Sequence, residues 1–275
     1  MVHDQRSALS SYVSSLLSAG RVVFSREEAQ EALGIGQGAF LDAAERLQRR
    51  HSLVSPRRGL YVIVAPQFTS WGAPPPTWYI DALMRHEGEP YYVGLLKAAE
   101  LHGATHQAVM EFQIITGKRL PRIKAGRSLI AFYFRKDLGA VAAGIENRKT
   151  DTGTMKVSSP ALTALDLLRY PHAAGGLDTI ATVLSDLASR IDSLQLGGLA
   201  ATTEKPVVQR LGYLLERLGH GEIVSALWES LSARAPFGWT ELDRRETRDP
   251  DFMPEPVERD ARWRVTVRRH PELDE

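Results

Sequence analysis

The chain has 275 residues, a length typical of two domains or one large domain. Hydrophobic residues make up 43% and charged residues 24%, which is ordinary for a globular protein and argues against a disordered, collagen-like or coiled-coil chain. The 34 lysines and arginines almost balance the 33 acidic residues, so any attraction to nucleic acid or membrane must come from local clusters. The lack of cysteine excludes disulfides, cysteine-ligated metals and a thiol nucleophile.

The same features predict a cytoplasmic protein. A cysteine-free chain suits a reducing compartment. The N-terminus runs through His3, Asp4 and Arg6 into a serine-rich amphipathic stretch, unlike the basic and then apolar segments of a signal peptide. No window approaches about eighteen uninterrupted apolar residues, so we expect no contact with a membrane.

Three short helices are expected near the N-terminus. Residues 7–19 repeat apolar side chains at helical spacing, with serines on the other side. Ser25 and Glu28 form the S-x-x-E pattern of a capping box, which opens a second helix ending at Gly34. A third helix over about 37–51 places Phe40, Ala44 and Leu47 on one face.

A hairpin is expected next, because apolar runs at 53–54 and 60–64 flank the turn-forming residues 55–59. Three helices followed by a hairpin with a basic tip are typical of a winged helix-turn-helix. In that fold the third helix enters the major groove of DNA and the hairpin tip reaches phosphate or the minor groove. Residues 1–65 are therefore predicted to be a DNA-binding domain.

The remaining chain predicts a larger mixed domain after a spacer. Residues 66–76 contain four prolines, which favour an extended linker. Beyond it, helices are expected over 77–86 and 91–102, strands over 110–116, 128–135 and 155–158, further helices from 160 to 231, and one strand over 263–267. The predicted fold class is α+β: an N-terminal winged helix-turn-helix followed by a larger mixed α+β C-terminal domain over 77–275.

Five arginines within thirteen residues form the first candidate site. They fall on the third helix, at its end and on the hairpin tip, without an acidic residue after Glu45. Arginine neutralises phosphate and can pair with guanine through two hydrogen bonds, so this cluster predicts DNA contact. Pairing with Glu45 at a solvated helix end is the alternative. The predicted DNA-binding residues here are Gln37, Arg46, Arg49, Arg50, Arg57 and Arg58.

A second basic cluster spans 118–136 and contains no acidic residue. Its seven positive charges on a strand-turn-strand segment would attract a polyanion. Protection of an edge strand is the competing interpretation. The residues predicted to contact neighbouring phosphates are Lys118, Arg119, Arg122, Lys124 and Arg127, and the cluster also includes Arg135 and Lys136.

Enzymatic patterns are weak. His102 and His106, with Glu100 nearby, resemble metal ligands, but Gly103 interrupts the helix that would align them. No nucleophile elbow, P-loop, zinc-protease or dinucleotide motif occurs. We therefore expect no enzyme activity, no metal and no cofactor. The alternative from another class is a metal-dependent nucleic-acid-processing enzyme that uses Glu146, Asp151 or Asp166, although Asp166 also fits a buried partner of an arginine.

The order of these segments resembles the AbiEi family over about residues 7–240. The resemblance is carried by the sequences YYVGLLKAAELHG at 91–103, SPALTALDLLRYP at 159–171 and QRLGYLLE at 209–216. AbiEi proteins are antitoxins and transcriptional regulators of abortive-infection, type IV toxin–antitoxin systems in bacteria.

The resemblance implies a repressor that binds inverted repeats in its own promoter through residues 37–50 and 55–59. It also implies an antitoxin that opposes a nucleotidyltransferase toxin without forming a stable complex with it, and it transfers no catalytic residue. A third hypothesis is a protein-interaction module, which weak and salt-insensitive DNA binding would favour.

Overall fold

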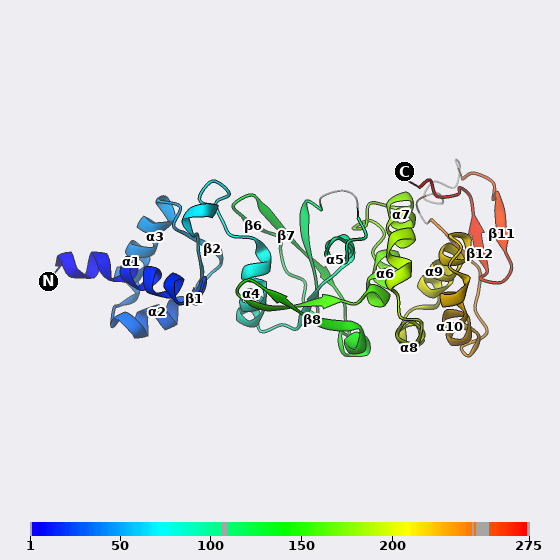
Figure 1. Cartoon of the computed structure of the whole chain (residues 1–275), viewed down its shortest axis with the longest axis horizontal. Coiled ribbons are helices and arrows are strands. Elements are labelled where there is room, and N and C mark those ends of the chain that lie inside the picture. The colour runs from blue at the N-terminus through cyan, green and yellow to red at the C-terminus, as the bar shows by residue number, and fades with distance from the viewer. Residues whose placement is uncertain (1, 106–108, 244, 246–252, 274–275) are drawn as a thin grey trace. The chain divides into compact units, whose positions relative to one another are not determined.

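The computed structural model describes residues 2–105, 109–243, 245 and 253–273 (Figure 1). The chain divides into two compact units. Unit 1 comprises residues 1–92, 110–136 and 147–156, and unit 2 comprises 93–109, 137–146 and 157–275. The architecture is mixed α+β, as expected. Within the described residues, no helix has the length and apolar character needed to cross a membrane.

Unit 1 begins with helices and a small sheet. The helices are α1 (Val2–Ser18), α2 (Arg26–Leu33) and α3 (Gln37–Arg49), and the strands are β1 (Val23–Ser25), β2 (Leu53–Arg57) and β3 (Leu60–Ile63). The strands pair antiparallel in the order β1-β3-β2. Figure 1 shows the three helices gathered on one side of β1 and β2. The β2–β3 hairpin is as expected, but β2 continues through Ser55 and Pro56 by a register shift after Val54.

Aromatic side chains form the centre of this region. The rings of Phe24 and Tyr61 stack with centroids 5.6 Å apart, and Phe40 meets Tyr61 edge-on at 5.2 Å. Because these rings come from β1, α3 and β3, one contact set joins helices to sheet. The capping expectation for α2 is confirmed in part: the Ser25 hydroxyl accepts from the Glu28 amide at 3.0 Å, while the Glu28 carboxylate pairs with Arg21.

The proline-rich segment is not an extended spacer. It contains two 3-10 turns, η1 (Pro66–Phe68) and η2 (Pro76–Trp78), joined by further turns. Gly72 approaches Gly126 so closely that a Cβ on Gly126 would overlap the Trp71 carbonyl oxygen. Gly126 also has a φ of 57°, a left-handed conformation that glycine adopts without strain. The segment therefore packs against a turn of the large sheet.

The large sheet has six strands in the order β6-β7-β5-β4-β9-β8. β5 and β7 run parallel from Glu111 opposite Leu129 to Thr116 opposite Phe134, and β6 pairs antiparallel with β7. The expected helix over 91–102 is wrong at its start, because 91–93 is a strand. β6 and β8 were not expected. The strands are β4 (Tyr91–Val93), β5 (Glu111–Thr116), β6 (Ile123–Ala125), β7 (Ser128–Phe134), β8 (Ile145–Thr150) and β9 (Gly153–Ser158), and helix α4 (Ile80–Glu87) precedes them.

Unit 2 is mainly helical. Its central helix α6 is buried from Ala161 to Leu168, and α5, α7, α8 and α9 contact it. A small sheet of order β10-β12-β11 completes the unit. The helices are α5 (Leu95–Leu101), α6 (Pro160–Arg169), α7 (Leu177–Leu187), α8 (Ser193–Thr202), α9 (Lys205–Arg217) and α10 (Gly221–Ser232), with 3-10 turns η3 (Gly139–Gly144) and η4 (Ala188–Arg190) and strands β10 (Thr240–Glu241), β11 (Glu258–Asp260) and β12 (Val265–Val267).

Helix α9 holds the small sheet through the segment QRLGYLLE. The Gln209 amide donates to the Trp263 carbonyl at 2.8 Å, and Arg210 donates to the Glu241 carbonyl at 2.8 Å. Gly212 leaves room for the fully buried Trp263 ring. This segment therefore has a packing role, which accounts for its unusual mixture of buried polar and apolar residues.

Candidate nucleic-acid interface

The third helix presents its polar residues to solvent. Gln37 is the first residue of α3 and is exposed, as are Arg46, Arg49 and Arg50 near the other end. Arg49 forms an exposed ion pair with Glu45 at 2.6 Å, one turn earlier. Such a pair is worth little in water, so Arg49 can exchange Glu45 for a phosphate at small cost.

The arginines of α3 do not all share one face. Phe40, Ala43, Ala44 and Leu47 form the buried face of the helix. Arg46 and Arg50, four residues apart, line a hollow of about 190 Å³ with Leu9, Ser10, Ala43 and Leu47 between α3 and α1. Arg49 points away from this buried face, and its side chain is 74% exposed. The helix thus carries cations on two adjoining surfaces.

Arg57 lies at the hairpin tip as the last residue of β2, but its side chain is not free to reach DNA as expected. It forms an ion pair with Glu87, in which the two side chains are only 19% and 14% exposed. Its Nη2 donates to the Pro121 carbonyl at 2.8 Å, and its guanidinium lies 5.6 Å from the centre of the Phe132 ring. Because Arg57 binds these partners, it connects the hairpin to α4 and to the segment before β6 within unit 1.

Arg58, the next residue, is exposed. Its carbonyl forms a 3.0 Å hydrogen bond with Nε2 of His86, which fixes the backbone and leaves the guanidinium outside. The hairpin therefore offers one exposed cation where the sequence predicted two.

The second cluster places most of its cations at exposed positions of unit 1. We define the basic strip as the five predicted residues, all of which are exposed: Lys118, Arg119, Arg122, Lys124 and Arg127. Within the described residues only Arg122 of these five forms an ion pair, with Glu111 at 3.0 Å. Arg135, by contrast, is buried and contacts the Tyr92 hydroxyl at 3.4 Å. The other four strip cations thus form no ion pair with a carboxylate of the residues that the structure describes.

A tyrosine of the large sheet also contacts the Arg122–Glu111 ion pair. The Tyr133 hydroxyl donates to Glu111 at 3.1 Å. Burial raises the pKa of Tyr133, and the neighbouring Glu111 carboxylate raises it further, so the hydroxyl keeps its proton and remains a donor. Arg122 is therefore held by a carboxylate that has two partners.

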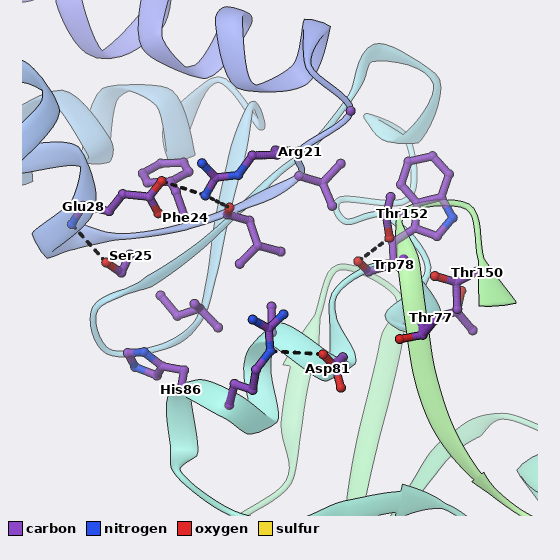
Figure 2. Close-up of a pocket in the computed structure, with 18 residues that line it drawn as sticks. Arg21, Phe24, Ser25, Glu28, Thr77, Trp78, Asp81, His86, Thr150 and Thr152 are labelled. Atoms are coloured by element: carbon purple, nitrogen blue, oxygen red, sulfur yellow. Dashed lines mark hydrogen bonds and ion pairs between the residues drawn. The ribbon is translucent and has the colours of Figure 1, made fainter. Parts of the chain in front are cut away.

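A cavity of about 500 Å³ lies beside β1 and α4 in unit 1 (Figure 2). Its walls carry two ion pairs, Arg21 with Glu28 at 2.6 Å and Arg85 with Asp81 at 3.1 Å. On the facing wall, the Thr152 hydroxyl donates to the Trp78 carbonyl at 2.7 Å. Since the positive and negative side chains are matched, the cavity lacks the net charge that would select an anion. No local sequence pattern indicates this cavity, because its lining comes from segments far apart in the chain.

The residues of the enzymatic alternative are dispersed. Glu146 lies on β8 and Asp166 is buried in α6, while Asp151 accepts a 2.7 Å hydrogen bond from Trp78 Nε1. His102 bonds the Ser158 carbonyl at 2.7 Å, and His106 lies outside the described residues. In the part of the chain that the structure describes, no three His, Asp or Glu side chains gather where they could hold a metal ion.

Part of the chain matches a known protein family. Residues 92–217 match the family model of the AbiEi antitoxin C-terminal domain. The chain carries an AbiEi antitoxin domain. The AbiEi match includes the whole basic strip and all of α9, and it extends from β4 to the end of that helix.

A solved structure is similar in fold to nearly the whole chain. The crystal structure of the RV2827C protein from Mycobacterium tuberculosis aligns with a TM-score of 0.69 and 18% sequence identity, covering 95% of this chain and 91% of that one. At this identity the similarity concerns the fold. The comparison with curated proteins finds no match.

Proposed function

We propose that this AbiEi protein is a DNA-binding autorepressor and the antitoxin of a type IV toxin–antitoxin system. The AbiEi domain match supports the antitoxin role. The observation that carries the DNA-binding part is the exposed arginine end of α3, next in sequence to an antiparallel hairpin with exposed Arg58. We propose no enzymatic activity for the chain.

The element order supports a winged helix. Helix α1, strand β1, helices α2 and α3 and then the β2–β3 hairpin follow the order of that fold. We propose that α3 enters the major groove and that the β2–β3 hairpin is the wing. Gln37 suits a base edge near the start of α3, and Arg46, Arg49 and Arg50 suit phosphate or guanine. Arg57 has its intramolecular partners and is left out of the interface.

The basic strip supports a wider contact with the duplex. Arg57 connects β2 to Pro121, two residues before the strand that carries Lys124. A duplex held by the hairpin would thus have strip cations within the same unit, available to neighbouring phosphates. The target proposed is a pair of inverted repeats in the promoter of its own operon, and the toxin opposed is a nucleotidyltransferase that it does not bind stably.

The experiment that tests the proposal measures binding of the full chain to a duplex from its upstream intergenic region. Replacing Arg49 and Arg50 by Ala should weaken specific binding by about 1–3 kcal/mol for each arginine that reads a base. Replacing both by Lys keeps the charges but removes the paired hydrogen bonds, so affinity for unrelated duplexes should be retained while sequence preference falls.

Arg259→Ala is the matched control, since Arg259 is an exposed arginine of β11 in unit 2. It should bind like the wild type. The proposal is rejected if the wild-type protein ignores its upstream duplex at low ionic strength, or if Arg49→Ala/Arg50→Ala changes neither affinity nor sequence preference.

A further inference from the structure

Two exposed aromatic rings accompany the basic strip. The Trp71 side chain is 57% exposed and Phe134 is 38% exposed. The Arg127 guanidinium lies 5.8 Å from the centre of the Trp71 ring, and that of Arg119 lies 5.0 Å from the centre of Phe134. A single exposed aromatic residue needs no explanation. Two rings, each beside a cation of the same strip, form a repeated arrangement.

The backbone fixes the position of Trp71. The Arg127 amide donates to the Trp71 carbonyl at 2.9 Å. The close approach of Gly72 to Gly126 permits this contact, because a side chain on Gly126 would collide with the Trp71 carbonyl. Trp71 is therefore held at the turn between β6 and β7, although it lies more than fifty residues earlier in the chain.

Phe134 lies at the other end of β7. That strand runs from Ser128 to Phe134, and six steps of about 3.3 Å separate its ends by about 20 Å. β6 pairs with the first part of β7, and Arg119 reaches the Phe134 ring, so cations accompany the strand along this length. The spacing suits a short run of nucleotides.

We propose that the basic strip, with Trp71 and Phe134, binds single-stranded nucleic acid. Lysine and arginine neutralise the backbone, and bases stack on the two rings. In a duplex the bases already stack on one another, so the rings give a single strand an advantage that the charges alone do not. The site shares the cations of the basic strip with the proposed duplex contact, whereas its two rings lie outside α3 and the β2–β3 hairpin. It goes beyond the proposed repressor function without depending on it.

The test uses the full chain and labelled oligonucleotides of about twelve residues, oligo(U) and oligo(dT), in fluorescence anisotropy at about 50 mM salt. The wild type should bind both. The double variant Trp71→Ala/Phe134→Ala should bind them at least about tenfold more weakly, because stacking contributes about 1–3 kcal/mol per base. Trp71→Phe/Phe134→Tyr, which keeps both rings, should retain most of the affinity.

Trp239→Ala is the matched control, because Trp239 is 53% exposed and lies in unit 2. It should leave single-strand binding unchanged. Similar affinities for oligo(U) and oligo(dT) support recognition through features common to RNA and DNA, and a preference for oligo(U) identifies RNA as the ligand through its 2′-hydroxyl groups. Either result supports the site.

The proposal is overturned if the wild type binds neither oligonucleotide, or if the ring-deleted variant binds both as the wild type does. Arg49→Ala/Arg50→Ala separates this outcome from failure of the repressor proposal. That variant should lose duplex recognition and keep single-strand binding, whereas the ring-deleted variant should change duplex binding by less than about twofold, because duplex bases are not available for stacking.

Discussion

Arg57 shows how a neighbouring pair of identical residues can separate in role. Arg58 is exposed, whereas Arg57 is enclosed by Glu87, the Pro121 carbonyl and the Phe132 ring. A guanidinium with three kinds of partner loses much of its hydration, and the partners compensate for that loss. Removal of the guanidinium would leave the Glu87 carboxylate charged and largely enclosed, which is unfavourable for the folded state.

Replacing Arg57 by Ala should destabilise the protein by about 2–3 kcal/mol, because it leaves the Glu87 carboxylate in a largely enclosed site without its cation. Urea unfolding at neutral pH measures this. Arg58→Ala is the control and should change stability by less than about 0.5 kcal/mol, as for an exposed surface residue. Equal unfolding midpoints for the two variants would contradict the assigned role of Arg57.

The sequence predicts the charges of the candidate site but not their partners. The exposed positions of Gln37, Arg46, Arg49 and Arg50 agree with the helical pattern of α3. The partner of Arg57 lies thirty residues later in α4, and no local pattern connects the two. Trp71 was likewise assigned only to a spacer, and its role beside Arg127 follows from the close approach of two glycines. Long-range pairing of this kind depends on the tertiary fold.

At the scale of secondary structure, strong local signals were reliable and short apolar runs were not. The Ser25 cap and the ends of α2 follow from hydroxyl-to-amide hydrogen bonding within one turn. Tyr91, Tyr92 and Val93 are all buried, so a run of three apolar residues has no periodicity that separates strand from helix. β8 has mostly exposed residues at the edge of the sheet, and hydrophobic patterning gives no signal there.

Helix α9 provides a test of packing between elements. A Cβ at Gly212 would overlap the Trp263 ring, which is fully buried between α9 and neighbouring residues of unit 2. In Figure 1, α9 lies beside β12, the strand that follows Trp263. The absence of a side chain at position 212 is therefore what lets the helix and the small sheet meet.

Gly212→Ala should destabilise the protein by about 1–3 kcal/mol, since overpacking forces the indole to move. Thermal unfolding and tryptophan fluorescence would both report the change. Gly198→Ala is the control, because Gly198 lies within helix α8 with open space around it. It should be neutral or stabilising by up to about 1 kcal/mol, as expected for alanine in a helix. A stabilised Gly212→Ala variant would refute the packing role.

At the scale of the whole molecule, distant parts of the chain are joined by ion pairs. Asp178 in α7 accepts from both terminal nitrogens of Arg269, at 2.8 and 2.9 Å, across 91 positions of sequence. The Arg269 hydrogen bonds, followed by one from the Glu272 amide, lower the pKa of Asp178 below its ordinary value. These contacts hold the end of the described chain against α7 within unit 2.

Because the folded-state pKa of Asp178 is lowered, its contribution to stability is present above the ordinary Asp pKa of about 4 and is lost as pH falls through the lower, folded value. Asp178→Asn should therefore cost up to about 1 kcal/mol at pH 7, and the difference from the wild type should shrink between about pH 5 and pH 3. Urea unfolding across this pH range provides the measurement. Asp42→Asn, at an exposed position of α3, should unfold like the wild type throughout; a pH-independent deficit in Asp178→Asn would rule out the linkage.

The contacts of Arg57 at the β2–β3 hairpin also limit how domains of this protein can be exchanged with those of another. These contacts are made with Glu87 and with the backbone at Pro121, both of which lie outside the first 65 residues. A chimaera in which only residues 1–65 came from another protein would lack Arg57 and leave Glu87 and the Pro121 carbonyl without their donor. A functional swap of operator specificity in this chain must therefore graft residues of α3 onto the resident scaffold and leave the hairpin anchor native.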